Sequence, residues 1–139
     1  MRVIFLIMLG LSLLDAEITR DDNLEIITDS TMQLMWQDDA VSATTTWQGA
    51  IDRCENLSLG TYNDWRLPNI NELKTIMDRN KIGPAIVSTF ANTSSSNYWS
   101  STTYERDKHS AWYIYFFDGS VSNNAKEYSL YVRCVRGGE

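Results

Sequence analysis

Few residues in this sequence have the types and spacing that enzymatic chemistry requires. A serine or cysteine nucleophile needs a histidine as its base, and the sequence contains one histidine, His109. His109 follows the charged residues 105–108, so exposure to solvent in a charged turn is the simpler interpretation. Zinc needs three or four nitrogen or sulfur ligands, which one histidine cannot supply once the cysteines are bonded to each other. We therefore expect no catalytic residue, metal or cofactor.

The carboxylates form no recognisable acid–base motif either. The adjacent Asp38 and Asp39 are most simply interpreted as a solvent-exposed turn, because no substrate pocket is evident around them. Their oxygen atoms, with those of Asp118 and Asn123, are an alternative set of calcium ligands that the sequence leaves open.

The chain opens on a segment typical of a signal peptide. Residues 3–14 are apolar and uncharged, and they follow Arg2. This run is shorter than the roughly 20 residues that a membrane-spanning helix needs, and no later segment approaches that length. We expect residues 1–16 to be removed on export and residues 17–139 to form a single domain, with no membrane insertion, in the periplasm, at the cell surface or outside the cell.

The two cysteines, Cys54 and Cys134, form either a structural disulfide or a pair of reactive thiols. An exported chain meets an oxidising compartment, where an even pair of cysteines predicts a disulfide. Reactive thiols are disfavoured because the sequence has no Cys-x-x-Cys motif and no clear set of cationic neighbours. A disulfide here closes a loop of about 80 residues, for which the chain-entropy model gives roughly 4 to 5 kcal/mol of stabilisation.

The charge of the sequence disfavours anionic partners. The formal net charge is −6, and removal of residues 1–16 leaves it unchanged because they carry one arginine and one aspartate. An acidic domain repels phosphate backbones, so we expect no nucleic-acid partner. A heparin-like anion would need a local basic patch from Arg66, Arg133 and Arg136.

Hydrophobic patterns in the first half of the chain predict a hairpin and two helices. Residues 24–36 predict two short strands joined by a turn. Residues 47–57 have helical spacing, with Cys54 on the apolar face and Thr45 or Thr46 as the cap. After a turn-rich loop, a second helix is predicted to begin at Asn69 with a capping box.

The second half of the chain is predicted to form a long loop and then strands. Residues 79–97 are polar and irregular, while residues 98–104, 111–117 and 120–122 have strand character. Asp118-Gly119 indicates a hairpin with a tight primed turn, because both residues tolerate positive φ. The last strand, residues 130–136, alternates so that Leu130, Val132 and Cys134 share one face.

Aromatic and hydroxyl side chains are the remaining candidates for function. In the strand 111–117 both faces are apolar or aromatic, so one face is either a ligand surface or a second core surface. Trp36, Trp47, Trp65 and Trp112 are most simply core residues. The candidate ligand-binding residues, which could stack on sugar rings and bond their hydroxyl groups, are Tyr98, Ser100, Ser101, Thr103, Tyr104, Tyr113, Tyr115 and Arg66.

Six ordered sequence blocks between residues 29 and 138 resemble a known family. These blocks are Leu34-Met35-Trp36-Gln37-Asp38; Thr46-Trp47-Gln48 with Ala50 and Cys54; Asp64-Trp65-Arg66-Leu67-Pro68-Asn69 with Glu72-Leu73; Tyr98-Trp99-Ser100-Ser101-Thr102; Ala111-Trp112 with Phe117-Asp118-Gly119; and Val132-Arg133-Cys134-Val135-Arg136-Gly137. Together they are similar to the family named for the C-terminal domain of the Legionella collagen-like adhesin.

The resemblance implies a C-type-lectin-like α+β fold with two helices, small antiparallel sheets and a disulfide from the first helix to the last strand. The namesake is associated with binding glycosaminoglycans and host surfaces, but this sequence lacks a collagen-like repeat and hence the trimeric stalk. It also lacks the Trp-Asn-Asp strand that calcium-dependent lectins use, so calcium-dependent sugar binding by that route is not expected.

The working hypothesis is an exported, non-catalytic, adhesion-type module that recognises a glycan or a surface protein of the cell envelope. One alternative is an extracytoplasmic enzyme of the formylglycine-generating type, which would need free cysteines. Another is a structural subunit that forms a homo-oligomer through its exposed aromatic face.

Overall fold

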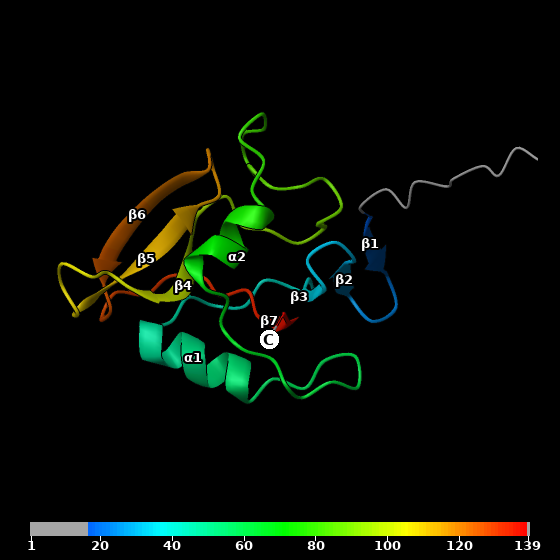
Figure 1. Ribbon diagram of the computed structural model, residues 1–139, viewed down its shortest axis with the longest axis horizontal. Coiled ribbons are helices and arrows are strands. Elements are labelled where there is room, and N and C mark those ends of the chain that lie inside the picture. The colour runs from blue at the N-terminus through cyan, green and yellow to red at the C-terminus, as the bar shows by residue number, and fades with distance from the viewer. Residues whose placement is uncertain (1–16, 139) are drawn as a thin grey trace, which may run out of the picture.

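This computed structural model describes residues 17–138, which form two helices and two small antiparallel sheets (Figure 1). The expected α+β class is therefore confirmed, while the C-type-lectin-like assignment stays a prediction from the family resemblance. The signal peptide expected at residues 1–16 lies outside the described residues. The elements are β1 (Ile18–Asp21), β2 (Ile26–Asp29), β3 (Leu34–Gln37), α1 (Trp47–Glu55), α2 (Ile70–Thr75), β4 (Asn97–Thr103), β5 (Ser110–Tyr115), β6 (Ser120–Ala125) and β7 (Val135–Gly137).

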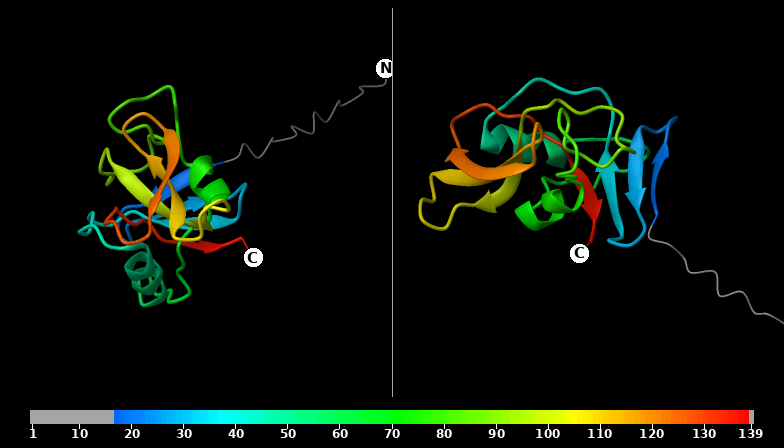
Figure 2. Two further views of the ribbon diagram at one scale, coloured as in Figure 1. Left: turned by 90° about the vertical axis from the view of Figure 1, so that its left-hand side faces the viewer. Right: turned by 90° about the horizontal axis from the view of Figure 1, so that it is seen from above.

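The first sheet joins the two ends of the described chain in the order β1-β2-β3-β7 (Figure 2). The predicted hairpin is confirmed by the antiparallel pairing of β2 with β3. The predicted strand at residues 130–136 is only partly formed, since β7 is three residues long. The preceding residues are hydrogen-bonded to different neighbours in turn: Leu130 to Thr45, and Tyr131 to Asn97 and Trp99. No single partner runs beside this segment for long enough to make one strand.

The second sheet has the order β4-β5-β6 and carries the predicted hairpin. Its connection differs from the prediction, because Tyr115 pairs with Ser120 and the loop is four residues, 116–119. Gly119 alone of these four has positive φ, at 84°. Phe116 explains the longer loop: its N–H donates to Ser96 and its carbonyl accepts from Ala85, so its backbone is bonded away from β6.

Both helices begin where the sequence predicts. The Thr46 side chain accepts the Gly49 N–H at the start of α1, and Asn69 and Glu72 form a complete capping box at the start of α2. Capping satisfies N–H groups that have no partner inside a helix. In Figure 1, α1 and α2 lie on opposite sides of the segments that follow β3 and precede β7.

Two clusters of buried side chains make up the core. One contains Ile114 of the second sheet and Phe116 of the loop that follows β5, together with Leu73 of α2. The other contains Trp99 and Ala111 of the same sheet together with Ala50 of α1, and it includes both cysteines. The three-stranded sheet is therefore covered on one face by α2 and, toward one end of its other face, by α1.

Candidate functional site

The register of β5 and β6 places aromatic and hydroxyl groups on the face of the sheet that α1 partly covers, and Tyr113 packs against the core cluster that includes Ala50 of α1. Tyr113 pairs with Ser122 and Tyr115 pairs with Ser120. Directly opposed residues of antiparallel strands lie on the same face, and every second residue along a strand returns to that face. We call these four residues, together with Phe117, the aromatic strip.

Phe117 extends this strip beyond the end of β5. Phe117 is 42% exposed, and the ring centroids of Tyr115 and Phe117 are 5.8 Å apart. The Gly83 N–H donates to the Phe117 carbonyl at 2.9 Å, which places the loop bearing Ile82 beside the strip. Ile82 is 69% exposed, so the strip ends in an apolar tip.

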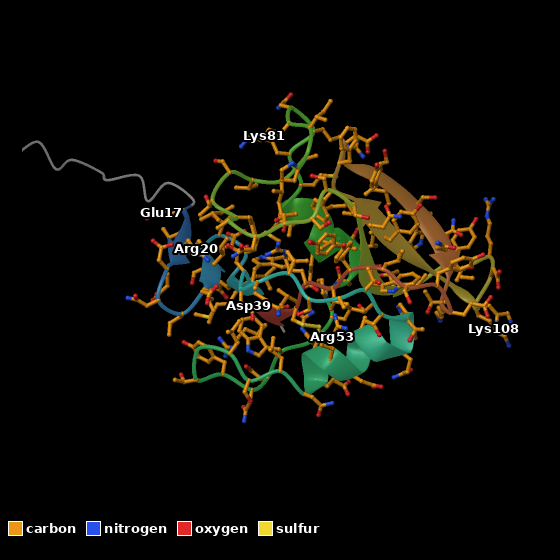
Figure 3. All side chains as sticks on the ribbon, turned by 180° about the vertical axis from the view of Figure 1, so that it is seen from behind. Glu17, Arg20, Asp39, Arg53, Lys81 and Lys108 are labelled. Carbon is orange, nitrogen blue, oxygen red and sulfur yellow. A yellow bond between two sulfur atoms is a disulfide. The ribbon has the colours of Figure 1, made fainter. Side chains whose placement is uncertain are left out.

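Cationic side chains flank the strip at a distance. Lys81 lies on the loop that carries Ile82, whereas Lys108 lies at the turn between β4 and β5, toward the other end of the same sheet (Figure 3). Between these two ends the strip residues themselves carry no charge. The strip is thus a neutral surface on a protein whose net charge is −6.

One carboxylate stands at the edge of the strip. Hydrogen bonds from the Ser120 hydroxyl and the Ser120 N–H lower the pKa of Asp118 below its ordinary value, and the charge of Arg79 adds to this effect. Asp118 therefore stays ionised at neutral pH and orients the Ser120 hydroxyl.

Two of the residues expected to bind a ligand are buried. Tyr98 is 1% exposed; its ring is stacked on Tyr131 and its hydroxyl accepts the Ser94 N–H at 2.9 Å. Burial raises the pKa of Tyr98, which keeps it protonated. Ser100 is 0% exposed and donates to the Trp112 carbonyl at 2.7 Å. Both side chains contribute to the core and do not belong to a ligand-binding surface.

Three other candidates lie at the opposite end of the sheet from the strip. The Thr103 hydroxyl accepts from Lys126 Nζ at 2.9 Å, and that ammonium group lies 4.0 Å from the Trp47 ring centroid. Tyr104 packs edge-on against Trp112. Ser101, half-buried, is held by its N–H, which donates to the Pro68 carbonyl. Of the eight candidates, Tyr113 and Tyr115 alone are brought together.

The last candidate, Arg66, and its two proposed companions do not form a basic patch. Arg66 donates to both oxygens of Glu72 at 2.7 Å and to the Gly137 carbonyl. Arg133 is bonded to Asp38, and Arg136 is bonded to Asp64. Each guanidinium is thus paired with a carboxylate, which Arg133 shares with Arg20, and the anion-binding surface considered from the sequence does not form.

The interpretation of Asp38 as part of a solvent-exposed turn is wrong. Its side chain is 0% exposed and accepts hydrogen bonds from Arg20 and Arg133 and from the Ala91 and Asn92 N–H groups. Burying a charged carboxylate is costly unless it is paired with an opposite charge, and Arg20 and Arg133 supply that charge to Asp38. Among residues 17–138, no three His, Cys, Asp or Glu side chains come together in a way that could hold a metal ion.

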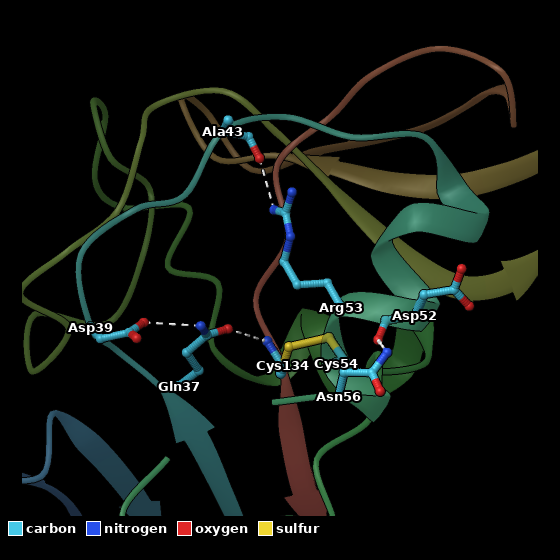
Figure 4. The surroundings of a disulfide bond; sticks show 8 residues. All are labelled: Gln37, Asp39, Ala43, Asp52, Arg53, Cys54, Asn56 and Cys134. Carbon is cyan, nitrogen blue, oxygen red and sulfur yellow. Dashed lines mark hydrogen bonds between the residues drawn. A yellow bond between two sulfur atoms is a disulfide. The ribbon is translucent and has the colours of Figure 1, made fainter. Parts of the chain in front are cut away.

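The disulfide is confirmed between Cys54 in α1 and Cys134 just before β7 (Figure 4). Both cysteines are 0% exposed. The Cys134 N–H donates to the Gln37 side chain, whose amide group donates in turn to Asp39. The bond joins the helix to the segment that leads into the first sheet, with both sulfur atoms in the core.

The chain matches the Lcl C-terminal domain family over residues 25–136, and it belongs to that family. The match covers most of the chain and includes the second sheet, both helices, the two cysteines and, of the first sheet, β2, β3 and most of β7. The expected family is therefore confirmed. No curated protein sequence matches the chain. In the described part of the chain, no helix has the length and apolar character needed to cross a membrane.

The serines of the strip and its apolar tip were not among the residues expected from the sequence. Ser120 and Ser122 could have been found from the hairpin, because a loop of two residues and a loop of four residues both place them on the same face as Tyr113 and Tyr115. A loop of two residues would have paired Tyr115 with Ser122 instead, so the individual pairs depend on loop length. Ile82 had no sequence signal, since its position depends on a hydrogen bond between distant loops.

Proposed function

We propose that this domain is an exported, non-catalytic binding module of the adhesion type that recognises a neutral glycan through the aromatic strip. The observation that carries the proposal is the row of partly exposed rings of Tyr113, Tyr115 and Phe117 beside the hydroxyl groups of Ser120 and Ser122. Membership of a family named for an adhesin domain supports a role at a surface.

The chemistry of the strip suits a sugar ring. A pyranose has an apolar face of C–H groups and a rim of hydroxyl groups, so it can stack on an aromatic ring while bonding to neighbouring polar groups. The Ser122 hydroxyl can both donate and accept hydrogen bonds, as sugar hydroxyls require, and the Ser120 hydroxyl, which donates to Asp118, can accept them. Because the rings are held on a β-sheet, little conformational entropy is lost on binding.

The electrostatics favour a neutral ligand over an anionic one. The net charge is −6, Asp118 stays ionised beside Ser120, and the three arginines considered for a basic patch are each paired with a carboxylate. A sulfated or carboxylated sugar would approach against this charge. Binding to a neutral glycan would depend only weakly on salt.

A glycan-array screen of the oxidised protein, followed by titration of the best glycan, tests the proposal. We expect Tyr115→Ala to weaken that binding about tenfold or more, since buried aromatic contacts dominate such sites. Tyr128→Ala is the matched control, because Tyr128 is 57% exposed and lies outside the strip; it should bind like the wild type. Equal loss in both variants, or binding that Tyr115→Ala leaves intact, would refute the strip as the site.

A protein ligand is the second candidate, because the exposed Phe117 and Ile82 would also suit a protein interface. Capture from envelope extracts by the wild type but not by Phe117→Ala would favour it. The alternative of a formylglycine-generating enzyme is less well supported, since it would need free cysteines and both cysteines are joined to each other in the core. Finding two alkylatable thiols in the unreduced exported protein would revive it.

A further inference from the structure

The outer edge of β6 lacks the features that normally prevent strands from pairing with other molecules. β6 is the last strand of its sheet, and its six residues, Ser120–Ala125, include no Lys, Arg, Asp, Glu or Pro. It pairs with β5 without a register shift over its whole length. Natural edge strands are usually protected by charge, proline, bulges or a covering segment.

The other sheet edges in residues 17–138 are protected. β1 carries Arg20 and Asp21 in its four residues. The outer side of β4 is covered by Tyr131, which is hydrogen-bonded to Asn97 and Trp99. β7 is three residues long and is bridged to Arg66. The edge of β6 differs from all of these in being both uncharged and uncovered.

The register identifies the backbone groups that face outward from this edge. The Lys126 N–H donates to the His109 carbonyl, which continues the β5–β6 register by one pair. Hydrogen bonding alternates along an antiparallel strand. The backbone N–H and C=O groups of Ser122 and Asn124 therefore point toward β5, while those of Val121 and Asn123 point outward from the edge of the sheet. Ala125 also faces outward, but its N–H is bonded to the Asn124 side chain.

We propose that two copies of this chain associate through their β6 edges, antiparallel about a two-fold axis at Ser122. Val121 of one copy then exchanges both backbone hydrogen bonds with Asn123 of the second copy, and the reciprocal pair forms on the other side of the axis. This register uses the outward groups of Val121 and Asn123 and makes no demand on Ala125.

A second copy fits this edge because the strand is neutral and its free groups are self-complementary. Antiparallel pairing places Ser122 opposite Ser122 and Ser120 opposite Asn124, so no like charges meet at the contact although each chain carries −6. The short contact buries little surface, so the association is expected to be weak and dependent on concentration.

Pairing would also change how the domain binds, if the aromatic strip is the binding site proposed above. The two-fold axis is perpendicular to the sheet, so both strips face the same side of one continuous six-stranded sheet. With strands about 4.8 Å apart, the two β5 strands are separated by about 14 Å. A repeating glycan could contact both strips at once, which would raise avidity.

Sedimentation velocity of the oxidised protein without ligand tests the association. We expect the mean mass to rise toward twice the monomer value as concentration increases, and Ser122→Lys to abolish this rise by placing two ammonium groups opposite each other. Thr19→Lys, which adds the same charge at an exposed position of β1, should associate like the wild type. A constant monomer mass in the wild type, or equal loss in both variants, would overturn the proposal.

Disulfide cross-linking tests the register. Residues in directly opposed positions that are not hydrogen-bonded have Cα atoms about 4.5 Å apart, within the range of a disulfide. Ser122→Cys should therefore cross-link into dimers under mild oxidation much faster than Ser120→Cys, whose two copies lie several residues apart. Equal rates, or cross-linking of Ser120→Cys alone, would refute this register. Because neither experiment uses a ligand, a negative result would overturn the dimer and would not affect the test of glycan binding.

Discussion

Arg133 Nη1 lies 3.0 Å from Asp38 Oδ1, and the two side chains are 4% and 0% exposed. The same carboxylate accepts from Arg20 Nε at 2.7 Å and from the Ala91 N–H at 2.8 Å. One buried acid therefore connects β1, the loop before β4 and the segment before β7, which are far apart in the sequence. The guanidinium group of Arg133 also lies over the Phe90 ring, with its Cζ 4.7 Å from the ring centroid.

Replacing Asp38 by Asn should destabilise the domain by about 4 kcal/mol, because it leaves Arg133 in the interior without its counter-charge, whereas Arg20 keeps Asp22. Urea denaturation of the oxidised protein at neutral pH measures the loss. Asp39→Asn is the matched control: Asp39 is half-buried and accepts one hydrogen bond from Gln37, so its loss should be about 1 kcal/mol. Similar losses in the two variants would contradict a structural role specific to Asp38.

This ion pair also shows where inference from sequence stopped. The caps at Thr46 and Asn69 act locally, so the sequence was sufficient to place them, and Asp118-Gly119 correctly indicated a hairpin although not the length of its loop. Asp38 and Arg133 are 95 positions apart, and no local pattern indicates that they meet. A doublet of aspartates looks solvent-exposed until its partner is known.

The strip illustrates the same limit for the candidate site. Alternation along β5 correctly grouped Tyr113 with Tyr115, because a strand places alternate residues on one face. Ser100 and Tyr98 also looked suitable by residue type. Their burial depends on packing against Tyr131 and Trp112, which belong to other segments. Residue type therefore identified the chemistry, and tertiary packing decided which groups are exposed.

Removing the disulfide should cost about 4.5 kcal/mol, since Cys54 and Cys134 are separated by 80 residues and cross-linking a loop of this size restricts the unfolded chain. The double variant Cys54→Ala/Cys134→Ala avoids an unpaired thiol and is compared with the oxidised wild type by urea denaturation. The reduced wild type serves as the control, and it should show a loss close to that of the double variant. A loss below about 1 kcal/mol in both would show that the packing around these sulfur atoms maintains the fold without the bond.

The Arg66–Glu72 pair should make stability depend on pH in the acid range. Burial alone would raise the pKa of Glu72, but hydrogen bonds from Arg66 and from the Asn69 N–H, with the charge of Arg66, outweigh it and lower the pKa. A carboxyl whose pKa is lower in the folded state contributes stability above its unfolded pKa and loses it as the pH falls through the folded value. We expect Arg66→Gln to cost about 2 kcal/mol at pH 7, with the difference from wild type shrinking below about pH 4.

Arg53→Gln is the control for this pH dependence. Arg53 donates to the Ala43 carbonyl and not to a carboxylate, so any loss of stability in this variant should be the same at pH 7 and pH 4. Denaturation midpoints across this range distinguish the two cases. A constant difference between wild type and Arg66→Gln at every pH would mean that Glu72 is not held ionised by Arg66.

Gly137 should not tolerate a side chain, because of both its backbone angle and its surroundings. Its φ is 85°, which L residues rarely adopt, and a Cβ there would lie 2.6 Å from the Gln33 carbonyl oxygen. Backbone cannot move aside without disturbing the pairing of β7 with β3, so we expect Gly137→Ala to cost about 2 kcal/mol or more. Gly138→Ala is the comparison: φ is 70°, but the nearest atom is the end of the flexible Leu34 side chain. Thermal unfolding should show a clearly smaller loss for Gly138→Ala, and equal losses would attribute the cost to φ alone and not to the contact with Gln33.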